Sequence, residues 1–205
     1  IRAGDNLFTA SIVAIDAYSG EYRWHFQQVH HDIWDYDAPN PVVLFDLEYD
    51  GVPRKGLAQA GKTGWVYILD RVTGEPLVGI EERAVPQEPR QATAATQPFP
   101  VGDPFVTQTL DIPPEGFDLT NQGRIFTPFW DEPILLKRGE ANWPPSTVDP
   151  GKGYMYVCAG ERQAAYSTQT DTDLASSGDR YTGGSMRFAP VPTTGVVAAV
   201  NLRDN

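Results

Sequence analysis

Short hydrophobic runs separated by turn residues dominate the chain, and the first two of them form a clear pair. Residues 10–16 are small or β-branched, as in a strand, and residues 22–27 alternate large side chains with a period of two. Between them the sequence Tyr-Ser-Gly-Glu at 18–21 has the serine and glycine that favour a turn. The pattern predicts a β-hairpin near the start of the chain.

The same unit of strand, aspartate, turn and returning strand occurs again further along. In the second copy the strand at 64–70 ends in Asp70, the turn Arg-Val-Thr-Gly follows, and the chain returns at 75–78. A third copy begins at residue 195 and breaks off at Asn205. Repetition of one short supersecondary unit is typical of the blades of a β-propeller.

The rest of the chain also favours strands and loops over helices. A further strand at 154–159 follows a turn at 149–153, and no window of about 12 residues shows helical apolar spacing free of proline and glycine. Residues 85–114, rich in Pro, Gln, Thr and Ala, are interpreted as one long irregular loop over the surface. We therefore predict an all-β fold, a partial β-propeller, in a single domain over residues 1–205.

Composition and charge exclude several classes of function. The 205 residues are 40% hydrophobic and 11% aromatic, which is typical of a globular protein. The net charge is −11 and the sequence has no basic cluster that would neutralise phosphates, so no nucleic-acid partner is expected. The sequence also lacks the glycine-rich nucleotide loops and the Gly-x-Ser-x-Gly elbow of serine hydrolases. Cys158 has no second cysteine to pair with, and its apolar neighbours predict a buried thiol.

Residues 14–24 have the form Ala-x-Asp-x-x-x-Gly-x-x-x-Trp, and each fixed position has a physical role. Gly20 permits the turn, and Asp16 can accept hydrogen bonds from the turn amides. Trp24 has a large planar side chain that buries much apolar area when it packs on a neighbouring sheet. The motif resembles the tryptophan-docking motif of quinoprotein dehydrogenases, in which the tryptophan packs between blades. Alone, the motif would also fit other propellers.

The segment that follows carries a more specific resemblance. Residues 24–37 read Trp-His-Phe-Gln-Gln-Val-His-His-Asp-Ile-Trp-Asp-Tyr-Asp. This resembles the W-x-F-Q-x-x-x-H-D-x-W-D segment of pyrroloquinoline-quinone (PQQ)-dependent methanol, alcohol and membrane glucose dehydrogenases. The paired histidines are most similar to the glucose and quinate dehydrogenase branch. Further similar segments follow in the family's order, so that the resemblance covers essentially the whole chain: 60–71, 82–87, 96–100 and 141–150.

The resemblance implies an architecture and an activity. Complete members have an eight-bladed propeller, so this chain, whose two ends resemble cuts inside a longer protein, is expected to supply about three four-stranded antiparallel blades. The implied cofactors are PQQ and Ca²⁺, or a lanthanide in place of Ca²⁺. The implied reaction is oxidation of a primary or secondary alcohol or a sugar, with electrons passed to ubiquinone or a cytochrome c. The implied location is the periplasm, with or without membrane attachment through a preceding segment.

Carried over by position, the resemblance assigns a general base and a cation. Asp35 corresponds to the family's catalytic aspartate, which takes the proton of the substrate hydroxyl as hydride leaves its carbon. Its neighbours Trp34 and Tyr36 predict a partly apolar wall that raises the pKa of Asp35; the alternative is an aspartate that only caps a turn. Lys62 corresponds to a lysine that stabilises negative charge developing on the quinone oxygens; the alternative is an exposed loop lysine.

Three further residues have less specific assignments. Asp37 resembles a metal ligand of lanthanide-using methanol dehydrogenases, because an extra carboxylate suits a hard trivalent ion. Glucose-type members carry an acidic residue here without that implication, so both interpretations stay open. Asn142 and Trp143 resemble an element that reaches the cofactor from a later blade. Their alternative is a loop asparagine beside a docking tryptophan.

The histidines of this segment do not predict a metal site. His30 and His31 are adjacent and lack cysteine or histidine partners at a zinc-binding spacing. They are interpreted as hydrogen-bonding groups that position Asp32 or the loop that carries Asp35.

Two alternatives to an active enzyme are compatible with the repeats. A non-catalytic propeller scaffold would need the repeated strands, but it would not need His-His-Asp-x-Trp-Asp, and that segment favours the enzyme. A decayed or truncated homologue would keep the motif without turnover. The fragment on its own is expected to be inactive if the cofactor needs the other blades.

Overall fold

The computed structural model describes residues 3–110, 112–117, 119–168 and 183–205, and nearly all of its regular structure is β-strand. The elements in chain order are β1 (Ser11–Ile15), β2 (Tyr22–Gln27), β3 (Val43–Tyr49), β4 (Val52–Ala60), β5 (Val66–Asp70), β6 (Ile80–Ala84), the 3-10 helix η1 (Pro89–Gln91), β7 (Thr96–Pro100), the 3-10 helix η2 (Thr120–Gly123), β8 (Ile134–Glu140), β9 (Thr147–Asp149), β10 (Tyr154–Thr168), β11 (Gly184–Phe188) and β12 (Thr194–Asn201). The predicted all-β class is confirmed. Within the described ranges no helix has the length and apolar character of a membrane span.

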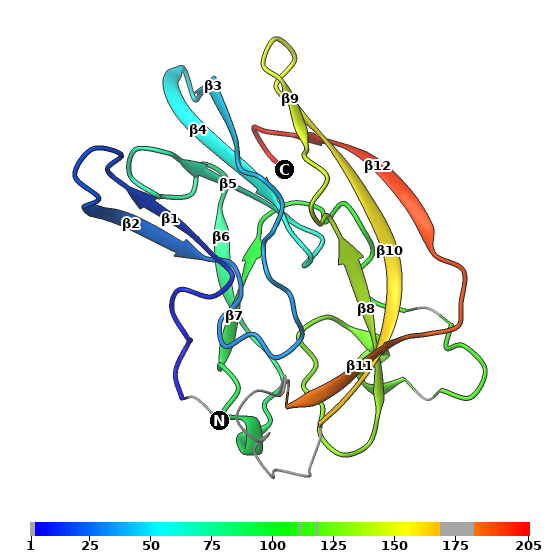
Figure 1. Cartoon of the computed structure of the whole chain (residues 1–205). Helices are drawn as coiled ribbons and strands as arrows, with labels where there is room; N and C mark the ends of the chain where they lie inside the picture. Colours follow the sequence, from blue (N-terminus) through cyan, green and yellow to red (C-terminus); the bar gives the residue numbers. More distant parts are fainter. Residues whose placement is uncertain (1–2, 111, 118, 169–182) are drawn as a thin grey trace.

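The described strands are grouped into four open, antiparallel sheets (Figure 1). They are the β1–β2 hairpin, the β3–β4–β5 sheet, the β6–β7 pair and a five-stranded sheet built from β8 to β12. In Figure 1 the first two sheets extend to the left and top of the molecule, while the long strand β10 runs down the opposite side. Small antiparallel sheets that succeed one another along the chain form a partial β-propeller, as predicted.

The sheets differ in size from the uniform four-stranded blades that we expected. The β3–β4–β5 sheet gains a fourth position only through a single bridge between Leu69 and Pro76, because a proline has no N–H to extend the ladder. In the five-stranded sheet, β10 is 15 residues long and pairs with two short strands along each edge. Strands β8 and β9 share one edge of β10, and β11 and β12 share the other.

One turn geometry recurs four times and accounts for the repeat in the sequence. In each turn the side-chain oxygen of the first residue accepts a hydrogen bond from the backbone N–H two positions on, at 2.8–3.1 Å. The N–H of the fifth residue donates to the C=O of the first at 2.8–2.9 Å, and this fifth residue has a φ of 67° to 81°. The first residues of these turns are Asp16, Asp70, Asp149 and Asn201, and the fifth are Gly20, Gly74, Gly153 and Asn205.

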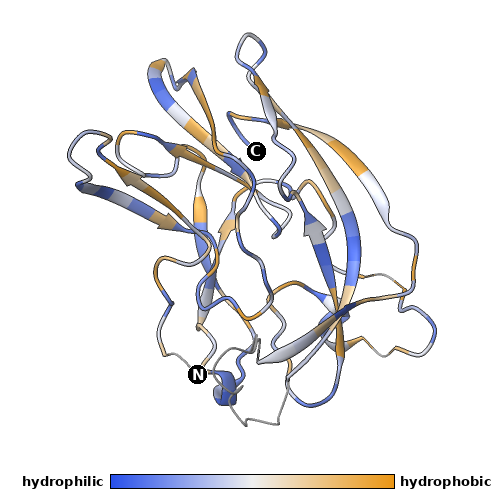
Figure 2. Cartoon of the chain, in the orientation of Figure 1, coloured by the Kyte–Doolittle hydropathy of each residue, from blue (hydrophilic) through white to orange (hydrophobic). Residues whose placement is uncertain are grey.

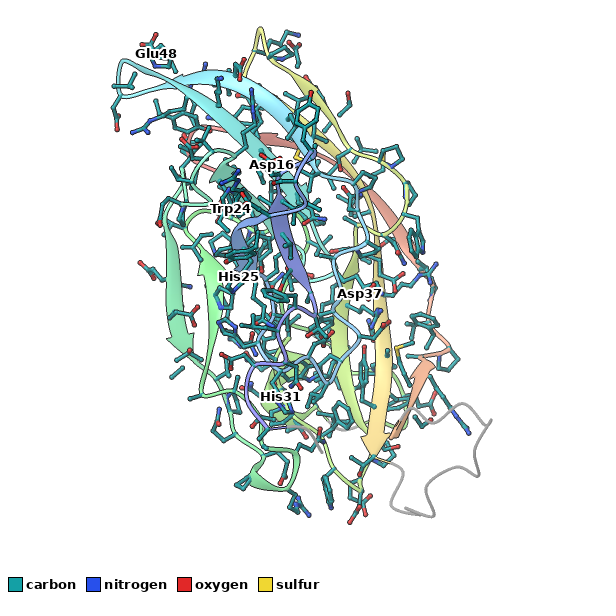
Figure 3. All side chains as sticks on the ribbon, turned by 60° about the vertical axis from the view of Figure 1, so that its left-hand side comes forward. Asp16, Trp24, His25, His31, Asp37 and Glu48 are labelled. Atoms are coloured by element: carbon teal, nitrogen blue, oxygen red, sulfur yellow. The ribbon has the colours of Figure 1, made fainter. Side chains whose placement is uncertain are left out.

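Trp24 docks on the next copy of this turn. Figure 3 shows Trp24 on the β1–β2 hairpin, near Asp16 at the turn end. The ring lies so close to Gly74 that a Cβ at position 74 would be 2.7 Å from two of its carbons. The predicted role of Trp24, to tie one repeated unit to the next, is confirmed.

Replacing Gly74 by alanine should destabilise the protein through two separate effects. The left-handed φ of 81° costs an alanine about 1–2 kcal/mol, and the added methyl group also clashes with the rigid indole ring. We expect a lower midpoint of thermal unfolding for the full-length protein. In a Trp24→Ala background the same substitution should lower stability only by the cost of the left-handed φ. The difference between the two backgrounds in a double-mutant cycle therefore measures the contact between Trp24 and position 74. An equal loss in both backgrounds would contradict docking.

The described residues contain four hydrophobic clusters, and the two largest form most of the interior. Figure 2 shows where hydrophobic residues occur along the chain. The larger lies between the β3–β4–β5 sheet and the β9–β10–β12 region, with Ala58, Ile68, Met155, Val157 and Leu202 almost fully buried. The second is mainly aromatic and lies below the loop between β2 and β3. This second cluster is the base on which the candidate site is built.

Two details of the sequence interpretation need correction. Residues 85–114 are not irregular throughout, because β7 lies within them and pairs with β6. Pro98 and Pro100 are atypical of a strand, so the sequence pattern did not predict one here. The prolines are tolerated because β7 lies in a two-stranded sheet, and its unpaired edge needs no N–H donors. Cys158 is exposed rather than buried, because alternation along β10 turns its side chain away from Val157 and the core.

Candidate active site

The loop between β2 and β3 carries Asp35 on a base of buried aromatic side chains. Trp34 and Tyr36 are 2% and 1% exposed, and their rings stack with centroids 5.7 Å apart. Trp34 Nε1 donates to the C=O of Thr127 at 2.8 Å, and the Tyr36 hydroxyl donates to the C=O of Lys137 at 3.1 Å. Because both neighbours are fixed inward, the side chain of Asp35 lies outward and is 60% exposed.

The backbone at Asp35 has a left-handed conformation, with a φ of 62°. Aspartate adopts this region more readily than most residues, although it is still disfavoured relative to the right-handed regions. The turn is held from one side by Asp32, whose Oδ1 accepts a hydrogen bond from the N–H of Trp34 at 2.9 Å. The alternative interpretation of a turn-capping aspartate therefore applies to Asp32, and not to Asp35.

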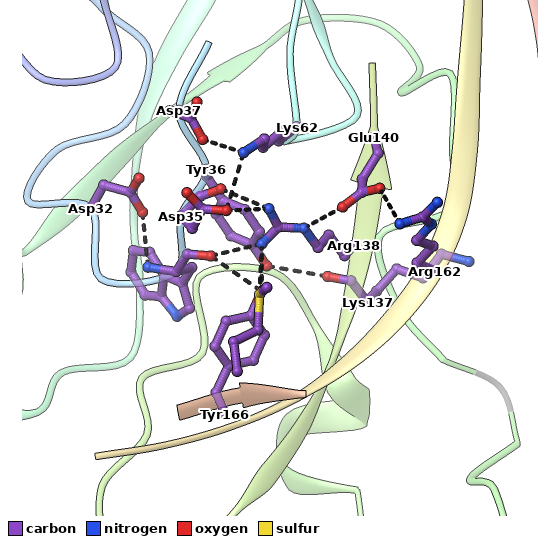
Figure 4. Close-up of polar contacts among 12 residues, drawn as sticks. Asp32, Asp35, Tyr36, Asp37, Lys62, Lys137, Arg138, Glu140, Arg162 and Tyr166 are labelled. Atoms are coloured by element: carbon purple, nitrogen blue, oxygen red, sulfur yellow. Dashed lines mark hydrogen bonds and ion pairs between the residues drawn. The ribbon is translucent and has the colours of Figure 1, made fainter. Parts of the chain in front are cut away.

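Lys62 lies in the loop between β4 and β5, and its ammonium group meets the two aspartates (Figure 4). Nζ donates to Asp35 Oδ2 at 3.1 Å and also donates to Asp37 Oδ1. The Lys62 side chain is only 7% exposed, whereas Asp37 is 46% exposed. Asp35 and Lys62 therefore lie together, and Lys62 is not an exposed loop lysine.

Arg138 on β8 is a second cation at this site, and the sequence did not predict it. Its Nη2 donates to Asp35 Oδ2 at 2.6 Å, and its side chain is 2% exposed. The signal in the sequence was a Lys-Arg pair inside an otherwise apolar strand, Ile-Leu-Leu-Lys-Arg-Gly-Glu. A buried guanidinium needs partners, but the local sequence does not say where those partners lie.

The two cations determine the ionisation of Asp35. Partial burial raises the pKa of Asp35, but hydrogen bonds and charge from Arg138 and Lys62 outweigh it and bring the pKa below its ordinary value. The predicted upward shift is wrong, because Trp34 and Tyr36 point away from the carboxylate. In contrast, burial raises the pKa of Asp32 to about 6, against the lowering effect of backbone hydrogen bonds from Trp34 and Tyr36.

Asn142 and Trp143 follow β8 and lie beside the same loop. The backbone C=O of Asn142 accepts a hydrogen bond from Asn40 Nδ2 at 3.0 Å. The side-chain Oδ1 of Asn142 is buried and has no hydrogen-bond partner among the described residues. Trp143 is 73% exposed, and within the same ranges no hydrogen bond joins either side chain to Asp35. Their assigned contact with a cofactor stays a prediction.

The described residues contain no cluster of three or more His, Cys, Asp or Glu side chains arranged to bind a metal. His30 bonds to Gln27 and Glu82, at 2.8 and 3.0 Å, and His31 Nδ1 lies 2.7 Å from the C=O of Gly4. These contacts fix the loop to its neighbours on β2, β6 and the N-terminal segment. None of these contacts goes to Asp32, so of the two predicted roles, positioning Asp32 or positioning the loop that carries Asp35, the contacts fit the second.

Comparison with known proteins places this chain in a family. Residues 1–200 match the family model described as "Glucose/ethanol/alcohol dehydrogenase, beta-propeller domain" of the PQQ-dependent enzymes. The chain belongs to this family. It is 37% identical over 164 residues to the quinohemoprotein alcohol dehydrogenase ADH-IIG of Pseudomonas putida, covering 80% of this chain and 20% of that protein. The chain thus spans about a fifth of that relative's length.

Other members show the same relationship. The quinate/shikimate dehydrogenase (quinone) of Acinetobacter baylyi is also 37% identical, over 76% of this chain and 22% of that protein, which is consistent with the predicted branch. The fold matches the quinohemoprotein alcohol dehydrogenase of Comamonas testosteroni with a TM-score of 0.65 at 23% identity, over 96% of this chain and 28% of that chain. A europium-containing methanol dehydrogenase matches with a TM-score of 0.63 at 20% identity, over 97% and 32%.

Proposed function

We propose that the protein to which this chain belongs is a PQQ-dependent dehydrogenase that oxidises a primary or secondary alcohol or a sugar, with Asp35 as its general base. The observation that carries the proposal is an outward-facing carboxylate held by two buried cations, Lys62 and Arg138. The lowered pKa keeps Asp35 ionised at neutral pH, as a base must be. A purely structural scaffold has no need to bury two cations beneath an exposed carboxylate.

The two carboxylate oxygens of Asp35 have different surroundings. Lys62 and Arg138 both donate to Oδ2, whereas in the described part of the chain Oδ1 has no hydrogen-bond donor. We infer that Oδ2 anchors the side chain and that Oδ1 takes the proton from the substrate hydroxyl. A base must lie within hydrogen-bond reach of that proton, and the exposure of Asp35 allows such an approach.

The residues fit a quinone cofactor with anionic and carbonyl oxygens. Lys62 can donate to a quinone oxygen. The buried Oδ1 of Asn142, which has no partner among the described residues, is an acceptor and would need an N–H or O–H donor of a ligand. When bound, PQQ supplies the acceptor for the hydride that leaves the substrate carbon. Trp143, with its exposed ring, offers an apolar face from the same segment.

Asp37 can supply only part of the ligand set of a metal ion. Ca²⁺ takes about six to eight oxygen ligands, and Asp37 offers one carboxylate that already contacts Lys62. We propose that Asp37 contributes to a Ca²⁺ or lanthanide site whose other ligands come from elsewhere in the full-length protein. We further propose a periplasmic enzyme that passes electrons to ubiquinone or a cytochrome c. Relatives named for a quinone and for cytochrome c support both acceptors.

The direct test is reconstitution of the full-length protein. It is loaded with PQQ and with Ca²⁺ or a lanthanide, and reduction of an artificial dye is followed for a panel of alcohols and sugars. We expect reduction that depends on both PQQ and the metal. Tight PQQ binding without oxidation of any compound in the panel would contradict the proposed function.

A further inference from the structure

Arg138 is buried in the middle of a strand, and every one of its hydrogen-bond donors is used. A guanidinium has five N–H groups. Nε donates to Glu140, Nη1 donates to the C=O of Trp34 and to the hydroxyl of Tyr166, and Nη2 donates to both the C=O and Oδ2 of Asp35. These five distances lie between 2.6 and 3.0 Å. A lysine has three donors and cannot reproduce this set.

Two of the five acceptors are successive backbone carbonyls. In an extended strand the C=O groups of neighbouring residues point to opposite sides, so one guanidinium cannot bind both. Here the left-handed φ of 62° at Asp35 turns its C=O and that of Trp34 toward Arg138. The same Nη2 holds the Asp35 carboxylate. Arg138 therefore restrains the backbone and the side chain of Asp35 together.

A glutamate on the same strand compensates the positive charge of Arg138 within the sheet. In the β8–β10 ladder Arg138 lies directly opposite Arg162, and like charges in opposite positions are destabilising. Glu140 offsets this repulsion, since Oε1 binds Arg138 at 2.7 Å and Oε2 binds Arg162 at 3.2 Å. The result is a row of alternating charges that leads into the site (Figure 4): Asp37, Lys62, Asp35, Arg138, Glu140 and Arg162.

We propose that Arg138 is a positioning residue that fixes the left-handed turn and Oδ2 of Asp35, so that Oδ1 points toward the substrate. This inference rests on the proposed function of Asp35 as the general base. Arg138 acts through Asp35, so its loss should displace the base without removing it. A displacement of about 1 Å can slow a reaction about a hundredfold.

The test compares Arg138→Gln with Arg71→Gln in the full-length protein loaded with PQQ and metal. Arg71 is a matched control: its Nη1 binds the C=O of Phe45 and Gly56, at 2.7 and 3.2 Å, and Asp46 at 2.8 Å, away from the site. We expect Arg138→Gln to lower kcat about 10–100-fold with KM changed less than about threefold. Arg138→Lys should restore only a small part of kcat, and Arg71→Gln should affect the thermal midpoint alone.

A second measurement does not depend on activity. In a crystal structure of the full-length Arg138→Gln protein, we expect Asp35 to leave the left-handed region or its side chain to change rotamer. If that variant does not fold, Glu140→Gln keeps the arginine but replaces its ion pair at Nε with a weaker, uncharged hydrogen bond, and should lower kcat by a smaller factor. Any of three results would overturn the inference. The first is an unchanged kcat in the folded variants, and the second is a kcat that falls only in step with thermal stability in Arg138→Gln and Arg71→Gln alike. The third is an Asp35 that has not moved in the variant crystal structure.

If the proposed function is wrong, the experiments give a different set of results. In that case the wild-type protein would oxidise no compound in the panel, yet the crystallographic comparison would still report whether Arg138 holds Asp35. An active wild type with an inactive Asp35→Asn variant and a fully active Arg138→Gln variant would leave the function standing and reject only the positioning role.

Discussion

Asp35→Asn should abolish almost all turnover in the full-length enzyme while leaving its fold and its PQQ binding intact. An amide oxygen does not take up a proton near neutral pH, and loss of a general base costs about 10²–10⁴-fold in rate. The backbone should tolerate the change, because asparagine also adopts the left-handed φ seen at Asp35. The amide oxygen can still accept hydrogen bonds from Arg138 and Lys62.

Two measurements separate chemistry from binding in this experiment. The kcat in the dye-linked assay should collapse, whereas PQQ titrated into the cofactor-free protein should bind with nearly wild-type affinity. Asp46→Asn is the matched control, since Asp46 is 71% exposed and pairs with Arg71 at 2.8 Å outside the site. An Asp35→Asn enzyme that kept a rate close to that of the control would remove Asp35 from the mechanism.

The residues that carried the family resemblance led to two side chains that the structure brings into contact. Asp35 and Lys62 are 27 residues apart, and the structure brings their side chains to 3.1 Å. This worked because both belong to one local unit, the loop before β3 and the loop after β4. The repeated turn could also be predicted from the sequence, because its hydrogen bonds join residues two to four positions apart.

Arg138 could not be found in the same way. It is 103 residues from Asp35, and contact over that distance depends on how β8 pairs with β10 and on how the sheets pack. A Lys-Arg pair in a strand shows only that a charge must be compensated somewhere. The error on the pKa of Asp35 has the same origin, because Trp34 and Tyr36 lie inside the protein and the unpredicted Arg138 lies beside the carboxylate.

Lys62→Met should lower kcat about 10²–10³-fold, the usual loss when one preorganised donor is removed from developing negative charge. It should also change the pH dependence. Because Lys62 helps to bring the pKa of Asp35 below its ordinary value, its removal raises that pKa. The base is active as a carboxylate, so activity is present above the pKa and is lost as the pH falls through it. The acid limb of kcat/KM should therefore move to higher pH in the variant.

The direction of that movement discriminates between two roles for Lys62. If Lys62 only binds the cofactor, PQQ affinity falls and the acid limb stays in place. If Lys62 also holds Asp35 ionised, the limb moves upward, and Lys62→Arg, which keeps the positive charge, returns it toward the wild-type position. Lys55→Met on the exposed part of β4 controls for loss of a surface charge. Superimposable acid limbs in wild type and Lys62→Met would mean that Arg138 alone sets the ionisation of Asp35, because Arg138 is the other cation in contact with that carboxylate among the described residues.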